Sequence, residues 1–107
     1  MNAIQLNIYR EPDRAIVTLV GEHEGYAARK LERELTRLLD DGYRVEIDLR
    51  RVQFIDSEVA AVLVAARKRA ESEDTELEVV VGGGTGWPVL RLLELTGLAS
   101  VLGVVRR

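Results

Sequence analysis

Three neighbouring polar side chains, Asp56, Ser57 and Glu58, stand where an apolar strand gives way to a predicted helix. Asp and Ser are both good N-caps, because their side-chain oxygens accept hydrogen bonds from the unpaired N–H groups of a first helical turn. A Glu in that turn is stabilised by the positive end of the helix dipole. Capping alone explains all three residues, and the alternative is that this turn carries a regulatory, partner-binding site.

A second candidate site is the glycine-rich stretch 82–86, which precedes Trp87 and Pro88. Backbone N–H groups at a helix start can hold a phosphate. However, no Lys-Ser/Thr pair follows as in a P-loop, and the glycines miss the spacing of a dinucleotide fingerprint. We therefore expect a flexible connector, with Trp87 partly exposed. The alternative is an anion-binding loop formed by Gly83, Gly84, Thr85 and Gly86.

Side chains for nucleophilic or metal chemistry are scarce. The chain has one histidine, His23, and no cysteine, which excludes disulfides, thiol catalysis and thiolate metal sites. Glu22, Glu24, Asp56 and Glu58 would cluster if the loop after the second strand approached the second helix, but a solvated acidic patch is the expected arrangement rather than a cation site. We predict no catalytic residues, no cofactor and no metal.

The composition fits one small domain spanning residues 1–107, because 47% of the 107 residues are hydrophobic and can form a core. The formal charge is −3, from 15 basic and 18 acidic side chains, whereas nucleic-acid binders usually show a basic excess. No basic segment leads into an apolar stretch at the start, and no apolar run reaches the roughly 18 residues of a membrane span. These features predict a cytoplasmic protein without membrane insertion or nucleic-acid binding.

The elements that position these residues follow from the apolar pattern. Alternation at Ile4, Leu6 and Ile8 predicts a strand, and a turn at 11–13 joins it to a second strand over 15–20, ended by Gly21. The short spacing favours an antiparallel hairpin. Helical spacing of leucines, or an apolar body, predicts helices over 27–39, 57–70 and 88–97, with one further turn at 98–102. Strands are predicted to alternate with them, over 45–49, 77–81 and 103–105.

This β-β-α-β-α-β-α-β order predicts an α/β protein with a mostly parallel sheet. The segment 45–58, which ends Phe54-Ile55-Asp56-Ser57-Glu58, resembles the strand–loop–helix of STAS domains in bacterial anti-sigma-factor antagonists, where Phe-Ile-Asp-Ser-Ser-Gly is common. Residues 21–24 resemble the family's Gly-Glu-Leu-Asp, and residues 89–98 are similar to its third helix and following turn. The resemblance covers nearly the whole chain and implies a STAS-type mixed sheet with an N-terminal β-hairpin and helices packed on it.

The resemblance also implies a regulatory site at the start of the second helix. It places the residue that a partner kinase phosphorylates at position 58, so Glu58 replaces the phosphoacceptor, and Val59 replaces the family's glycine. Glu58 is then expected to act as a phosphomimetic that fixes one state, and the rival is a direct salt bridge to a partner. Phosphorylation of Ser57 is a further alternative, although a capping Ser is often tied up with the backbone.

The function implied by the resemblance is that of a non-enzymatic module which binds an anti-sigma-factor kinase and so affects sigma-factor release. The alternatives are a regulatory or structural subunit of a transporter-associated or stress-signalling complex, and a nucleotide or small-ligand sensor using the glycine loop. The cognate partner and the oligomeric state, including a homodimer, stay open. The expected contact residues are Glu24, Asp56, Ser57, Glu58 and Val59.

Overall fold

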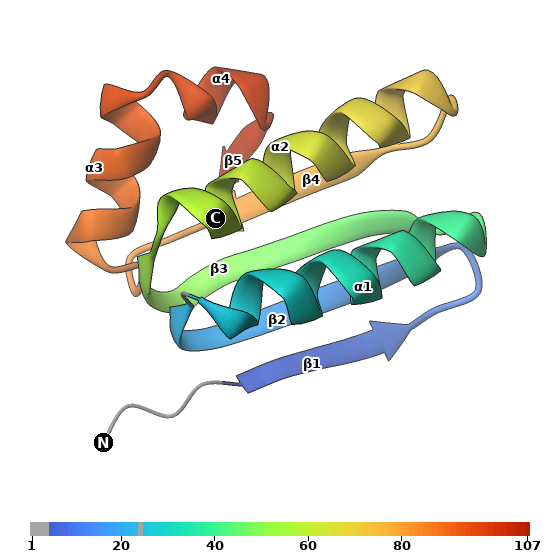
Figure 1. Cartoon of the computed structure of the whole chain (residues 1–107), viewed down its shortest axis with the longest axis horizontal. Helices are drawn as coiled ribbons and strands as arrows, with labels where there is room; N and C mark the ends of the chain where they lie inside the picture. Colours follow the sequence, from blue (N-terminus) through green and yellow to red (C-terminus); the bar gives the residue numbers. More distant parts are fainter. Residues whose placement is uncertain (1–4, 24) are drawn as a thin grey trace.

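The chain begins with an antiparallel hairpin in the computed structural model, which describes residues 5–23 and 25–107 (Figure 1). Strand β1 (Gln5–Arg10) pairs with β2 (Arg14–His23), and the Glu11 N–H donates to the Arg14 carbonyl at 2.8 Å to close the turn. The predicted hairpin is confirmed, while Ile4 of the expected alternation lies outside the described residues. The hairpin places the second strand beside the parallel part of the sheet.

Three further strands, β3 (Arg44–Ile55), β4 (Leu77–Val81) and β5 (Val104–Arg106), run parallel to β2. Their order across the sheet is β1-β2-β3-β4-β5. Each parallel step needs a crossover, and helices supply it: α1 (Tyr26–Asp40), α2 (Ser57–Ser72), and α3 (Trp87–Leu95) followed by α4 (Leu98–Val101). The expected mixed, mostly parallel α/β sheet is confirmed, with the predicted further turn at 98–102 formed by α4.

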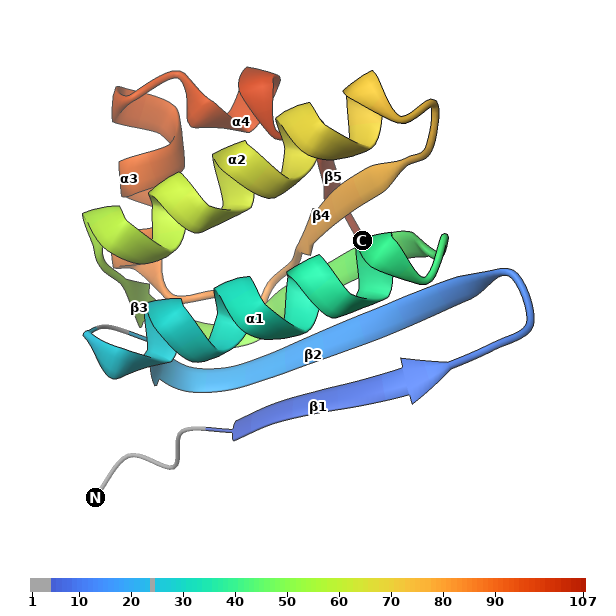
Figure 2. The ribbon, with the colours of Figure 1, turned by 45° about the vertical axis from the view of Figure 1, so that its right-hand side comes forward.

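The helices lie on one face of the sheet, as Figures 1 and 2 show. On β2 the inward residues Ala15, Val17 and Leu19 are fully buried, whereas their neighbours on the other face are half-buried. Alternate residues of a strand point to opposite faces, so this pattern identifies the helix-covered side as the core. None of the described helices combines the length and the apolar character that crossing a membrane requires.

The uncovered face of the sheet carries charged side chains that pair with one another. The Glu46 carboxylate lies 3.0 Å from Arg107 and 3.5 Å from Arg14, and Arg107 also contacts Glu78 at 2.7 Å. These pairs join side chains from strands β2, β3 and β4 and from the end of the chain. The uncovered face therefore carries a cluster of paired charges of both signs.

Strands β2 and β3 are both longer than expected. The sequence pattern ended the second strand at Gly21 and the third at residue 49, but pairing continues to His23 opposite Ile55. Two register shifts, one of them beside Gly21 with a φ of 95°, carry the strands past the break in apolar alternation. The strand thus fills most of the gap left between the predicted strand at 45–49 and the predicted helix at 57–70, and only Asp56 separates β3 from α2.

Candidate functional site

The carboxyl ends of β2, β3 and β4 bring three connections together at one end of the sheet. Parallel strands end at the same edge, so the β2–α1 turn, the start of α2 and the glycine stretch 82–86 lie next to one another. The Asp56 N–H donates to the His23 carbonyl at 3.2 Å, and the Gly86 N–H donates to the Val52 carbonyl at 2.7 Å. The end of β2 and the glycine stretch 82–86 are therefore both hydrogen-bonded to the segment that leads into α2.

Asp56 is the N-cap of α2, as the sequence predicted for either Asp56 or Ser57. One carboxylate oxygen accepts the Val59 N–H at 2.9 Å, which satisfies a free donor of the first turn. The other oxygen accepts the Gly25 N–H at 3.0 Å from the β2–α1 turn. The Asp56 carboxylate therefore caps α2 and also binds the turn that leads into α1.

Ser57 and Glu58 form the exposed first turn of α2. Among the hydrogen bonds of the described residues none involves the Ser57 hydroxyl, because Asp56 does the capping. The capping bond to the backbone is made by Asp56, and phosphorylation of Ser57 stays a prediction. The residue is exposed at the positive end of the α2 dipole, where an added negative charge is stabilised.

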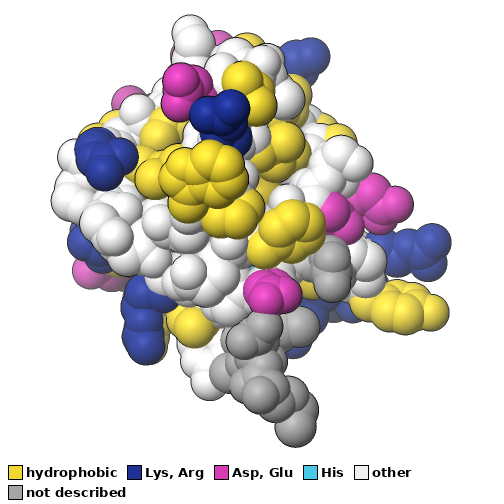
Figure 3. Space-filling model, turned by 90° about the vertical axis from the view of Figure 1, so that its left-hand side faces the viewer, with side chains coloured by type: hydrophobic (Ala, Val, Ile, Leu, Met, Phe, Trp, Pro, Cys, Tyr) yellow, Lys and Arg dark blue, Asp and Glu magenta, His cyan; other side chains and the backbone are white. Residues whose placement is uncertain are grey.

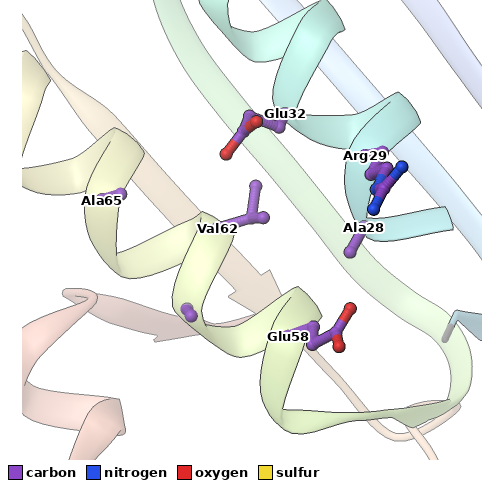
Figure 4. Close-up of a pocket in the computed structure, with 7 residues that line it drawn as sticks. Ala28, Arg29, Glu32, Glu58, Val62 and Ala65 are labelled. Atoms are coloured by element: carbon purple, nitrogen blue, oxygen red, sulfur yellow. The ribbon is translucent and has the colours of Figure 1, made fainter. Parts of the chain in front are cut away.

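Glu58 lies at one end of a groove of about 400 Å³ between α1 and α2. Figure 4 shows its carboxylate pointing toward α1, near Ala28 and Arg29, with Glu32 farther along the same gap. The rest of the lining is small or apolar, from Ala61, Val62 and Ala65. The groove thus presents charged groups around an apolar floor, an arrangement suited to a protein surface rather than to a buried substrate.

Two of the predicted contact residues do not take part in the described surface. Val59 has 0% exposure and belongs to the core, so its inclusion among the contact residues is wrong. The residue lies on the inward face of α2, one step round the helix from Glu58. Glu24 lies outside the described residues, and its contact role stays a prediction.

His23 is buried at the end of β2, where its Nε2–H donates to the Val20 carbonyl at 2.9 Å. Burial lowers the pKa of the His23 imidazole below its ordinary value, and the hydrogen bond to Val20 only partly opposes this effect. A neutral, buried imidazole that is bonded to the backbone has a structural role beneath the site. Within residues 5–23 and 25–107, no group of three or more metal-ligating side chains is placed to hold an ion.

The glycine stretch 82–86 is packed against β3, which corrects the expectation of a flexible connector. Thr85 is buried, its hydroxyl donates to the Leu49 carbonyl at 3.0 Å, and the Gly82 N–H donates to that hydroxyl at 3.0 Å. A Cβ on Gly84 would lie 2.7 Å from the Arg50 carbonyl oxygen, and one on Gly86 would overlap the Gln53 backbone. Close backbone approach explains these glycines, while anion binding by Gly83, Gly84, Thr85 and Gly86 stays a prediction.

Exposed aromatic side chains flank the start of α2. Trp87 at the beginning of α3 is 68% exposed, as expected, and the Arg91 guanidinium lies over its ring at 5.3 Å from the centroid. Tyr26 at the beginning of α1 is 89% exposed, and sequence reasoning missed it. The available signal was an aromatic residue directly after a glycine and ahead of the first buried helical position.

An apolar groove between α2, α3 and α4 adjoins this end of the molecule. It is lined by Ala61, Val64, Leu92 and Leu98, with Ser57 among the lining residues and the exposed Leu95 nearby on α3. Figure 3 shows hydrophobic side chains gathered on the face that carries α3. Exposed aromatic and aliphatic groups around a polar turn are typical of protein-binding surfaces.

Relatives of the chain include the anti-sigma-B factor antagonists of Listeria monocytogenes and Listeria innocua, each 29% identical over 96 residues, which are 89% of this chain and 82% of the relative. An anti-sigma factor antagonist from Mycobacterium paratuberculosis has a similar structure, with a TM-score of 0.81 and 24% identity over 95% of this chain and 85% of that one.

The anti-sigma factor antagonist SpoIIAA in its unphosphorylated form matches with a TM-score of 0.79 at 15% identity, covering 98% of this chain and 88% of that chain. Its phosphorylated form matches with a TM-score of 0.73 at 14% identity, covering 98% and 91%. At these identities the solved structures establish the fold. The model of the family described as "Mlab, STAS domain" matches residues 6–105, and the chain therefore belongs to the STAS domain family.

Proposed function

We propose that this protein is a non-catalytic interaction module that acts in the cytoplasm by binding an anti-sigma factor of the kinase type and so affects sigma-factor release. The observation that carries the proposal is the exposed Ser57–Glu58 turn, fastened at the edge of the sheet by Asp56. Curated relatives at 29% identity are anti-sigma-B factor antagonists, which supports the same role here. Flanking exposed Tyr26 and Trp87 supply the aromatic contacts that protein interfaces favour.

Ser57 is the residue of this turn whose charge an enzyme can change. Ser57 is exposed, and the N-cap position of the helix is already filled by Asp56. Transfer of the γ-phosphoryl group of ATP to the Ser57 oxygen would release ADP and add about −1.5 to −2 charges at a helix start. Such a charge would alter contacts of a docked partner by repulsion and desolvation, while Asp56 would keep the helix capped.

Glu58 gives the same turn a charge that no phosphatase removes. We propose that it partly imitates a phosphorylated residue and biases the protein toward one binding state. The rival proposal is that Glu58 forms a direct salt bridge with a cationic side chain of the partner. The two proposals predict opposite changes in affinity when Glu58 is replaced, because removal of a mimic strengthens binding and removal of a salt-bridge partner weakens it.

Binding to candidate anti-sigma kinases, measured by calorimetry for the wild type and Glu58→Ser, separates the two roles. Tighter binding of the variant supports mimicry, and weaker binding supports the salt bridge. Asp41→Asn is the matched control, because Asp41 is an exposed carboxylate at the far end of α1. If Glu58→Ser and the control bind as the wild type does, the start of α2 is not the contact surface.

Intact-mass measurement after incubation with the same kinase and ATP tests Ser57. One added phosphate on the wild type and none on Ser57→Ala identifies the acceptor. A phosphate that persists on Ser57→Ala places the acceptor elsewhere. A kinase that binds the wild type and adds no phosphate leaves Glu58 as the residue that sets the binding state.

The same surface would suit a regulatory subunit of a transporter-associated or stress-signalling complex, in which phosphorylation is not required. The nature of the neighbouring genes discriminates this alternative, since a kinase-type anti-sigma gene favours the switch and transporter genes favour the subunit. Calorimetry with ATP and GTP in the absence of a kinase tests the ligand-sensor alternative. A flat titration leaves the glycine stretch 82–86 as a structural connection.

A further inference from the structure

The outward face of α2 carries a regular stripe of exposed residues. Glu58, Ala61, Ala65 and Lys68 are exposed, whereas Val59, Leu63 and others of the inward face are buried. Successive stripe residues are three, four and three positions apart, which is the spacing of a coiled-coil seam. Helices α1 and α3 lie to either side of α2, so the described part of the chain leaves this seam facing solvent.

The two charged residues at the ends of the stripe have no ion-pair partner within the described residues. Other charged side chains of the same helix are paired: Arg67 with Glu71, and Arg69 with Glu73 and Asp40. Between Glu58 and Lys68 the outward face carries no charge at all. The seam therefore offers an acidic group at one end, a basic group at the other, and a small, uncharged middle.

These positions are symmetric about the middle of the helix. Glu58 and Lys68 are equally distant in sequence from Leu63, and so are Ala61 and Ala65. In an antiparallel pair of α2 helices, a two-fold axis at the level of Leu63 would place each Glu58 beside the partner copy's Lys68 position. Such an axis generates the closed, self-complementary contact that most homodimers use.

We propose that a second copy of this chain docks on the α2 seam, forming a two-fold dimer with two Glu58–Lys68 ion pairs between copies. Alanines at the centre allow the helix axes to approach to the short end of the usual 8–10 Å range. The half-buried Val62 and Val64 beside the seam would lose further exposure. The antiparallel arrangement also sets the positive end of each helix dipole near the negative end of the other.

The contact is small, so a weak dimer is expected. Two helices meeting through one seam bury less than the roughly 1,200 Å² of a standard interface. Sedimentation velocity should therefore be run from about 10 µM to about 1 mM, where an association of this class becomes visible. The inference does not rest on the proposed function, since the test contains this chain alone.

Zero-length carbodiimide cross-linking tests the ion pair directly. Lys68 lies ten positions after Glu58 on the same helix, a rise of about 15 Å, so an amide bond between them cannot form within one copy. A mixture of ¹⁴N- and ¹⁵N-labelled protein should yield a mixed heavy–light peptide joining these two residues. Absence of that peptide at concentrations where sedimentation detects dimers would overturn the proposal.

Exchange of the charges at positions 58 and 68 is the second test of the proposed dimer. Glu58→Lys and Lys68→Glu should each weaken dimerisation at least tenfold, because each places like charges opposite one another, and the double exchange should restore it. Lys30→Glu on the exposed side of α1 is the matched control and should leave dimerisation unchanged. Circular dichroism confirms that each variant is folded. A wild type that stays monomeric at about 1 mM, or a double exchange that fails to restore the dimer, contradicts the proposal.

Discussion

The Asp56 carboxylate accepts the N–H of Gly25, which lies 31 residues earlier in the chain, at 3.0 Å. The same side chain caps α2 through the Val59 N–H. Gly25 has a φ of 57° and directly precedes α1, so this turn cannot move far without breaking the bond. The starts of two helices are thus coupled through one side chain, and the Ser57–Glu58 turn sits on that junction.

Removal of the Asp56 carboxylate should destabilise the protein measurably. Asp56→Ala loses the N-cap and the bond to Gly25, and we expect the free energy of unfolding to fall by roughly 1–3 kcal/mol. Asp56→Asn retains an oxygen acceptor for the cap and should lose less. Urea titration followed by circular dichroism measures both. Equal losses in the two variants would contradict the assignment of the cap to one carboxylate oxygen and of the Gly25 hydrogen bond to the other.

Gly86 should tolerate no larger side chain. A Cβ at this position overlaps the Gln53 carbonyl and Cα, so Gly86→Ala should cost roughly 1–3 kcal/mol of stability by forcing the loop away from β3. Gly83→Ala is the matched control, because a Cβ there meets nothing within 4 Å. Thermal unfolding compares the two variants. A loop that accepts both substitutions equally would not be packed as described.

The stability of the protein should depend on the protonation of His23. Its pKa in the folded state is lowered from 6.5 by burial, so the unfolded chain binds the proton more readily. The stabilising effect of the neutral imidazole is complete above pH 6.5 and is lost as the pH falls below that value, by at most about 1.4 kcal/mol per pH unit. His23→Gln should show a shallower decline in the free energy of unfolding over the same range.

Arg50 should stabilise the fold by satisfying a nearly buried carboxylate. Burial raises the pKa of Asp48, but hydrogen bonds from the Arg50 side chain and backbone outweigh this and lower it. Arg50→Leu leaves that carboxylate with the backbone N–H of residue 50 but without the guanidinium, and should lower the free energy of unfolding at neutral pH. Arg51→Leu, a change at the exposed neighbouring position, should cost much less. Urea titrations of both variants at pH 7 provide the measurement.

The hairpin, the alternating helices and the parallel strands were all predictable, because most segments have one apolar face at the right period, while residues 57–70 and 77–81 are apolar nearly throughout. The ends of β2 and β3 were not. Arg50-Arg51 interrupts the apolar alternation of the third strand, and Gly21 is a typical strand terminator. Pairing between Glu22 and Phe54, and between His23 and Ile55, continues across register shifts that local sequence does not reveal.

At the site, sequence reasoning identified the helix start and the capping carboxylate but not the orientation of every neighbour. Val59 was grouped with Ser57 and Glu58 because they are consecutive, yet each helical residue turns about 100° from the last. The spacing of Val59 with Leu63 and Ala66 already indicated the inward face. The packing of the glycine stretch against β3 was hidden, because nothing in residues 82–86 specifies which distant strand they approach.

Placing every helix on one side of the sheet gives the molecule a front and a back. The back, which carries Thr18 on β2 and the Arg107–Glu46 pair, stays uncovered when a partner occupies α2. A tether attached at Thr18 would therefore leave the helix-covered side of the molecule free. Contacts on the two faces are therefore not mutually exclusive.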